Sequence, residues 1–369
     1  MWEGEDIVKK AKSLHLLGMK ALLGAMLVFL LWGTGFANGE IAEDEAFVLT
    51  VTEALSVADE HNLRLANARL DLEHAEKQFT KAQADAAITP SPVALRQAEI
   101  DLELHKLLLQ ETRRQVELEV QNTYYEVNSK IQLQDIAAAN LVQVEEQLRI
   151  ISVKHDEGLA TKLDLLNAEK GVLQAKGALE AANAGVELSL LELKNALGVP
   201  YTEEIVLEES EALVDPLDLT MEQVVDRVLK HSIELTRLQW SLEVHQLQEE
   251  SAKNEYTAPL IKELHSNRRM KAELELKEGT RSVFFSAKQA WNNLNQAESD
   301  VAVAEKELEA AEENYKIIKT RFEGGLEIPN NLLQAQVSLT SAQHAVVSAR
   351  FNFHLARIRL LNLMGESAE

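Results

Sequence analysis

The sequence contains two long segments that repeat each other at a fixed distance. Gly158 and Gly325 are 167 positions apart, and the same distance separates Gly198 from Gly365. A spacing that is kept over about forty residues indicates an internal duplication. The two halves of the chain should therefore fold into the same unit, and the fold must bury the faces that the two copies share.

Each half divides into three predicted helical pieces. All six prolines lie at the boundaries between these pieces. A proline inside a helix removes a hydrogen bond and clashes with the preceding turn, so the prolines indicate where the helices end. The two openings share a capping box, formed by Thr50 and Glu53 in one half and by Thr220 and Gln223 in the other. The pieces run over 51–87, 93–155 and 164–197 in the first half, and over 221–256, 260–322 and 331–364 in the second.

The relative lengths of the pieces predict how they pack. The middle piece is about as long as the other two together, so we expect the first and third pieces to lie end to end, antiparallel to the middle one. The predicted fold is all-α, with two tandem repeats of long antiparallel coiled-coil hairpins and little or no β structure. The first repeat is predicted over 38–200, a linker over 201–216 and the second repeat over 217–369.

The N-terminus reads as a separate element. Lys20 precedes an apolar run over 21–32, and Ala37 gives a plausible cleavage position, so residues 1–37 are predicted to be a signal peptide whose true start could be Met19. The alternative is an uncleaved signal anchor, although the run is short for a membrane span. Both predict an exported protein of the cell envelope, periplasmic or associated with the outer membrane.

The composition excludes several classes of function. The chain has no cysteine, and its formal net charge of −23 argues against a nucleic-acid partner, which requires a basic surface. The ten histidines show no metal-binding spacing, and neither a phosphate-binding loop nor a serine nucleophile motif is present. We therefore expect no enzyme, no catalytic residues, no cofactor and no metal.

The third piece carries apolar residues at every seventh position in two parallel rows. The row of large residues is Leu165, Val172, Leu179, Val186 and Leu193, repeated as Leu332, Leu339, Val346, Phe353 and Leu360. The row of small residues is Ala168, Ala175, Ala182, Ser189 and Ala196, repeated as Ala335, Ala342, Ala349, Ala356 and Leu363. Small residues in one row let helix backbones approach closely, so the pattern predicts tight antiparallel packing.

A second apolar row flanks the first on the third piece. Its members are Leu166, Leu173, Leu190 and Leu197 in one half, and Leu333, Val347 and Leu361 in the other. A helix with two apolar rows has neighbours on both sides, which two hairpins alone cannot supply. The pattern therefore favours a closed ring of helices, and the alternative is a long coiled coil that dimerises.

These residues resemble the TolC-like outer-membrane efflux proteins over roughly 47 to 366. The resemblance depends on the duplicated opening "TEALSVADEHNLRLANARLDLEHAE", on "EGLATKLDLLNAEKGVLQAKGALEAANAGVELSLLELKNALGVP" and on the second copy that ends in "RLLNLMG". It implies a homotrimer whose protomers give two hairpins each to a twelve-helix tunnel. It also implies a periplasmic adaptor (membrane fusion protein) and an inner-membrane pump as partners.

The resemblance places the docking site for the adaptor at the two Gly-Leu corners. The implied contact residues are Gly158, Leu159, Thr161, Gly325 and Leu326, with Asp164 supporting the first turn. A helix that ends in such a corner requires a glycine in any case, so a plain helix cap is the simpler interpretation of the two glycines, and the two interpretations are compatible.

The sequence departs from the family in two places. Where the family has a pair of strands in each half, "AITPSPVALRQ" and "NEYTAPLIKEL" pass from helix to helix within a few residues, so the strands of the family's β-barrel are expected to be missing. At the acidic positions of the family's pore constriction, this chain has Asn331 and Gln334. The first-half counterparts are Asp164 and Asn167, and a constriction would have to depend on steric closure or on Asp164, Glu323 and Glu327.

Two functions remain open from the sequence. The first is a passive conduit of a tripartite efflux or type I secretion system, for small molecules or polypeptides. The second is a coiled-coil structural or adaptor protein of the envelope that forms no pore. The missing strands keep the second hypothesis open.

Overall fold

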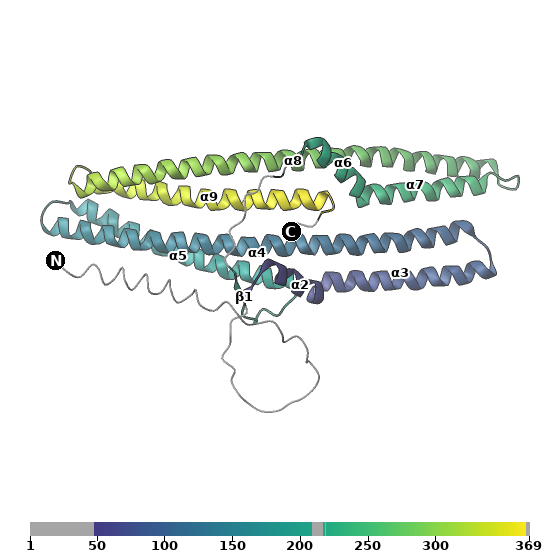
Figure 1. The fold of residues 1–369 in the computed structure, drawn as a ribbon, viewed down its shortest axis with the longest axis horizontal. Coiled ribbons are helices and arrows are strands. Elements are labelled where there is room, and N and C mark those ends of the chain that lie inside the picture. Colours follow the sequence, from purple (N-terminus) through teal and green to yellow (C-terminus); the bar gives the residue numbers. More distant parts are fainter. Residues whose placement is uncertain (1–47, 209–216, 218, 367–369) are drawn as a thin grey trace, which may run out of the picture. The chain divides into compact units, whose positions relative to one another are not determined.

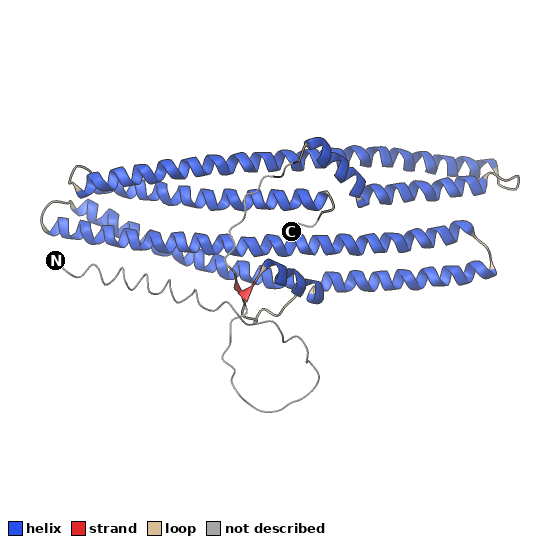
Figure 2. Ribbon diagram, viewed as in Figure 1, coloured by secondary structure: helices blue, strands red, loops and turns tan. Residues whose placement is uncertain are grey.

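The computed structural model describes residues 48–208, 217 and 219–366. The predicted signal peptide, residues 209–216 of the predicted linker and the last three residues lie outside the described part. Figure 2 shows that the described part is almost entirely helical, with one pair of short strands. The predicted all-α fold is confirmed.

The first half folds as one long helix with three shorter helices along it. Helix α4 (Pro92–Asp156) is antiparallel to α3 (Leu63–Ile88) along one part of its length and to α5 (Lys162–Leu197) along the other. The short helix α2 (Val51–His61) precedes α3 and also packs on α4. The predicted arrangement of two pieces laid end to end on the middle piece is confirmed.

The second half repeats this arrangement. Helix α8 (Pro259–Glu323) is paired with α7 (Ile233–Ala252) and α9 (Pro329–Leu363), and α6 (Met221–His231) packs on its middle. Helices α4 and α8 have 65 residues each, which corresponds to about 98 Å at 1.5 Å per residue. Gly279 lies inside α8 without interrupting it, and α7 packs directly on this glycine, because a Cβ atom there would lie 2.4 Å from Leu238 Cδ1.

The first piece of each half is two helices, so the prediction of one continuous helix was wrong. The break falls at Asn62 in the first half and at Ser232 in the second, where the backbone is extended. Both residues cap the following helix: Asn62 Oδ1 accepts from the N–H groups of Arg64 and Leu65, and Ser232 Oγ from that of Leu235. Such local bonds compete with helix continuation, and the sequence pattern does not show which one prevails.

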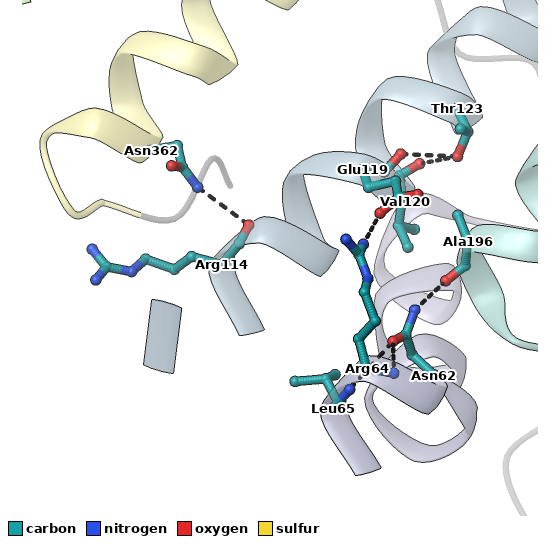
Figure 3. A network of polar contacts seen from close by, with 9 residues as sticks. All are labelled: Asn62, Arg64, Leu65, Arg114, Glu119, Val120, Thr123, Ala196 and Asn362. Carbon is teal, nitrogen blue, oxygen red and sulfur yellow. Dashed lines mark hydrogen bonds and ion pairs between the residues drawn. The ribbon is translucent and has the colours of Figure 1, made fainter. Parts of the chain in front are cut away.

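The break at Asn62 is tied to the rest of the first hairpin (Figure 3). The Asn62 Nδ2 donates to the carbonyl oxygen of Ala196 at 2.8 Å, and Arg64 forms an ion pair with Glu119 of α4. Asn62 is buried, and at Gly198, just after Ala196, a Cβ atom would lie only 2.4 Å from the carbonyl oxygen of His61. The ends of α2, α3 and α5 therefore meet at one closely packed point.

A short parallel pair of strands joins the start and the end of the first half. Strand β1 (Val48–Leu49) pairs with β2 (Val206–Leu207), which lies in the predicted linker. The buried Tyr124 of α4 donates its hydroxyl to the carbonyl oxygen of Leu49 at 3.0 Å, and burial raises the pKa of this phenol to about 12. The strand pair therefore connects the segment before α2 to the segment after α5, beside the middle of α4.

At one end of each half, a short turn connects the helices where the resemblance implies strands. Residues 89–91 link α3 to α4, and residues 253–258 link α7 to α8. The prediction that the strands are missing here is confirmed.

We expect Asn62→Ala to lower the free energy of unfolding by about 1–3 kcal/mol, because it removes a helix cap and leaves a buried carbonyl oxygen without its donor. Ser232→Ala at the corresponding break is the matched control. It removes a cap but no long-range bond, so it should cost about 1 kcal/mol or less. Urea unfolding followed by circular dichroism measures both, and an equal loss in the two variants would contradict the assigned role of Asn62.

Candidate functional site

The two Gly-Leu corners adopt the same backbone turn. Gly158 and Gly325 have φ angles of 75° and 73°, in the left-handed region that a glycine enters without a steric penalty. The N–H of Leu159 donates to the carbonyl oxygen of Lys154 at 2.7 Å, and the N–H of Leu326 to that of Arg321 at 2.8 Å. These bonds define a helix end of the Schellman type. The duplication therefore preserves the corner itself in addition to the helices.

Both corners are open to solvent. A Cβ atom added to Gly158 or Gly325 would have no other atom within 4 Å, and the side chains of Leu159 and Leu326 are largely exposed. Exposed leucines at a tight turn add nothing to the core of the protomer. These corners therefore offer the apolar side chains that a docking partner could cover.

The first corner is held by a capping box between Thr161 and Asp164. The carboxylate Oδ2 of Asp164 accepts from the backbone N–H of Thr161 at 2.9 Å and from its hydroxyl at 2.6 Å, while the N–H of Asp164 donates to Thr161 Oγ1 at 3.1 Å. The hydrogen bond from the Thr161 hydroxyl, followed by that from its backbone, lowers the pKa of Asp164. Asp164 is therefore bonded within the turn, where the resemblance gave it a supporting role.

The second corner is stabilised by different side chains. Ile328 occupies the position of Thr161 and gives no side-chain cap, and Pro329 begins α9. Glu327 supplies the hydrogen bonds of this turn instead. Its Oε1 accepts from Asn331 Nδ2 at 2.7 Å and from the N–H of Ile328 at 3.3 Å. The bond from Asn331 is the main cause of the lowered pKa of Glu327, and Arg321 forms an ion pair with the same carboxylate.

The residues predicted for a pore constriction fall into three places. Asp164 and Asn167 line a small cleft together with Pro329 and Asn330 of the other hairpin. Glu327 and Asn331 are bonded to each other at the second corner. Glu323, at the end of α8, and Gln334, on α9, are exposed. The six residues thus lie near the corners but do not form one cluster within a single protomer.

An apolar cluster holds the two corners together. Its buried members are Ile151 and Ala168 of the first hairpin and Phe322 and Leu332 of the second. The Lys154 Nζ lies 3.9 Å from the centre of the Phe322 ring, a cation–π contact that sequence reasoning missed. The corners of one protomer are therefore a single, jointly packed unit.

The two hairpins pack through α9 on α4. Asn140 Oδ1 of α4 accepts from Gln336 Nε2 at 3.1 Å and from Thr340 Oγ1 at 3.2 Å. Further along, Asn362 Nδ2 donates to the carbonyl oxygen of Arg114 at 3.2 Å (Figure 3). The sequence analysis did not single out these residues, whose only sign was polar side chains on helices with apolar rows.

A pair of aromatic rings, one buried and one half-buried, belongs to the same interface. The rings of Tyr125 on α4 and His354 on α9 are 3.8 Å apart between centroids, and neither ring nitrogen of His354 has a hydrogen-bond partner. Burial, followed by the charge of Arg357, lowers the pKa of His354 to about 4. The interface therefore contains an imidazole that must stay neutral.

The second apolar row is covered along α9, whereas on α5 it is open only over the part near the Gly-Leu corner, since Leu190 is half-buried and Leu197 is buried. On α9, Leu333 is half-buried against the first hairpin and Leu361 is buried. On α5, Leu166, the counterpart of Leu333, is 49% exposed, and Leu173 is 71% exposed. The second hairpin thus contacts the first through the part of this row that contains Leu333. The counterpart of that part on the first hairpin, with Leu166, is left open by the described part of the chain.

Comparison with known proteins agrees with this geometry. The sequence model of the family described as outer membrane efflux protein matches residues 265–366, which lie in the second half. No curated protein sequence matches the chain. The matched family is one of efflux proteins, in agreement with the expectation that the chain is not an enzyme.

Solved structures of outer-membrane channels share the fold. The outer membrane protein VceC from Vibrio cholerae has 15% identity and a TM-score of 0.68, with 86% of this chain and 97% of that chain covered. The CmeC outer membrane channel from Campylobacter jejuni has 11% identity and a TM-score of 0.66, with 93% and 95% covered. The outer-membrane channel OprN has 13% identity and a TM-score of 0.71, with 86% and 90% covered.

The resemblance to TolC-like outer-membrane efflux proteins is therefore confirmed. The second half has the family's sequence pattern, and the protomer has the fold of its channels. Within residues 48–208, 217 and 219–366, no helix combines the length and the apolar character needed to cross a membrane. The same residues contain no group of three or more acidic or histidine side chains placed to hold a metal ion.

We expect Gly158→Ala and Gly325→Ala each to destabilise the protein by about 1–2 kcal/mol, because a Cβ is strained at a positive φ. Gly177→Ala is the matched control, since Gly177 lies inside α5 with open space around it and alanine is the better helix former by about 0.5–1 kcal/mol. Thermal unfolding compares the three variants. A stabilising effect at either corner would contradict the assigned turn.

His354 predicts a dependence of stability on pH. Its pKa is lower in the folded chain, so between about pH 6.5 and pH 4 the unfolded state binds more protons and stability falls as the pH falls. His354→Phe keeps a ring beside Tyr125 and should remove up to about 3 kcal/mol of this loss. Urea unfolding of both proteins across this pH range is the measurement. Identical pH profiles would show that His354 is not the titrating group.

Proposed function

We propose that this chain is the helical protomer of a passive conduit in the cell envelope. Three copies would close into a tunnel of twelve helices, and solutes would pass through it without any chemical step. The family match in the second half and the fold shared with outer-membrane channels support this proposal. The proposal includes the division of the chain into a first repeat over 38–200, a linker over 201–216 and a second repeat over 217–369.

The open face of α5 is the observation that carries the proposal. The duplication makes α5 the counterpart of α9 and α8 the counterpart of α4. Within the chain α9 packs on α4, whereas the corresponding face of α5, with Leu166 and Leu173, is exposed. The α8 helix of a second copy would present to α5 a surface built like the one that α4 presents to α9.

An interface of this kind joins unlike faces, so each copy can add another in the same direction. Such contacts close into a ring when the rotation per copy permits it and otherwise form a filament. The resemblance to trimeric channels favours closure after three copies, each supplying two hairpins. A closed ring would cover every α5 face, which a dimer of this interface would leave half open.

The corners are the proposed docking site for a periplasmic adaptor that links the tunnel to an inner-membrane pump. Gly158, Leu159, Thr161, Gly325 and Leu326 would form the contact surface, with two corners in each protomer. The proposed gate lies beside them, where Asp164 and Asn167 face the second hairpin across the small cleft. The proposed systems are tripartite efflux and type I secretion, and the proposed location is the periplasm and the outer membrane.

A spacer without a pore is the second candidate. The short turns at 89–91 and 253–258 favour it, because the helices there turn back directly instead of continuing into strands. The state of association separates the two functions, since a spacer can work as a monomer or a dimer.

We expect light scattering after size exclusion to show a trimer for the full chain in mild detergent. Leu166→Glu combined with Leu173→Glu should convert it to a monomer of unchanged helicity, because two charges would be buried in the proposed interface. Val142→Glu is the control: Val142 is exposed on α4, and its counterpart on α8 is already Glu309. A wild-type monomer, or a trimer that survives the double substitution, would contradict the conduit.

A further inference from the structure

The ends of the hairpins away from the Gly-Leu corners carry exposed apolar side chains. We call residues 86–95 and 256–261 the proline tips, because they contain Pro90, Pro92 and Pro259. Ile88 is 84% exposed, Tyr256 is 98% exposed and Leu260 is also exposed. These side chains contribute nothing to the core, so their burial must come from outside the protomer if it occurs.

The two tips lie at the same end of the molecule. Figure 1 shows the turn from α3 to α4 beside the turn from α7 to α8, and the corners at the opposite end. Close to the tips, Arg96 of α4 forms a bidentate ion pair with Glu243 of α7, with nitrogen–oxygen distances of 2.8 and 3.1 Å. One protomer therefore presents both apolar tips in the same direction.

The proline tips have no charged residue, although 26% of the chain is charged. The first tip is bounded by Asp85 and Arg96 and the second by Glu255 and Lys262, so charges begin directly beyond both tips. The tips therefore offer an apolar end with a charged border, the pattern of a segment that enters a lipid interface to a limited depth.

The backbone at the tips is also suited to a medium with little water. The three prolines have no N–H group, the N–H of Thr89 donates to the carbonyl oxygen of Asp85, and the N–H of Tyr256 donates to Asn254 Oδ1. A turn that enters a lipid interface must satisfy or remove its donors, because the acyl region supplies no partners. Tyr256 adds an aromatic ring with a polar end, the type of side chain enriched at membrane–water interfaces.

We propose that the proline tips insert into the surface of a lipid bilayer and anchor this end of the hairpins there. The bilayer surface is an uncharged one, because the net charge of −23 repels anionic headgroups and the tips bring no cation to offset it. The inference deepens the proposed conduit by naming the partner of this end. Insertion of the tips of one chain does not require the ring. The ring would determine only how many tips insert together.

The absence of cysteine permits a direct test with the full chain. Single cysteines at Ile88 and Thr257 in the tips, and at Leu159 and Leu326 in the corners, would be labelled with an environment-sensitive fluorophore. Phosphatidylcholine vesicles that contain a nitroxide-labelled lipid should quench roughly half of the fluorescence at the tips, as expected for insertion by about 5–10 Å. The corner labels should stay unquenched, whatever other part of the chain binds the vesicles.

Matched charge variants separate insertion from general binding. Tyr256→Asp with Leu260→Asp should abolish quenching at position 257, whereas Leu159→Asp with Leu326→Asp, the same charge change at the corners, should leave it intact. All four positions are exposed, so both variants should keep the wild-type circular dichroism. Replacing a third of the phosphatidylcholine by phosphatidylglycerol should weaken the quenching.

Three results would overturn the inference. The tip labels would stay unquenched with vesicles, or they would respond only to vesicles that contain membrane proteins, or they would shift without lipid as the chain concentration rises. The second result would assign the tips to a protein partner and the third to another copy of the chain. Light scattering of the same samples reports the trimer separately, so failure of the anchor and failure of the conduit are distinguishable.

Discussion

The packing of the second hairpin on the first is the interaction on which the rest of the structure depends. Small residues on the third helix of each half, such as Ala168 and Ala335, are buried and let long helices approach closely. Because the two hairpins arise from a duplication, any contact between unlike faces of the two leaves one counterpart of each face free. A monomer with two equivalent hairpins therefore keeps one face of each kind that no other hairpin covers. The proposed ring would cover these faces, and it would gather the corners at one end and the tips at the other.

The proposed contact between copies cannot be chemically identical to the contact within the chain. Within the chain, Gln336 donates to Asn140, but the counterparts of these residues are Glu169 on α5 and Glu307 on α8. Two carboxylates cannot form the bond that two amides form, so the contact between copies must take its stability from the apolar row that contains Leu166 and Leu173. In the proposed ring, the contact between copies would therefore lack the amide hydrogen bond that joins the two hairpins of one chain.

Much of the fold could be predicted because helix signals repeat. Prolines, capping boxes and the seven-residue rows placed the long helices within a few residues, and they showed that α5 and α9 need neighbours on two sides. The breaks at Asn62 and Ser232 could not be predicted, since a capping side chain competes with helix continuation by a small free energy that depends on packing. The strand pair was missed because a two-residue strand leaves no pattern. At the corners, the resemblance implied that Asp164 supports the turn, but it gave Thr161 only as a docking residue. The contact of Lys154 with Phe322 joins two hairpins and has no local signal.

The most direct measurement is a disulfide cross-link between α5 of one copy and α8 of the next. Leu173 and Glu307 are the counterparts of Thr340 and Asn140, whose side chains are hydrogen-bonded at 3.2 Å within the chain. In the otherwise cysteine-free protein, Leu173→Cys with Glu307→Cys should give covalently linked trimers on a denaturing gel after mild oxidation, and either single substitution should give none. A product that stays monomeric, or a linked dimer formed by one single substitution, would show that the open face of α5 does not receive α8 and would contradict the ring.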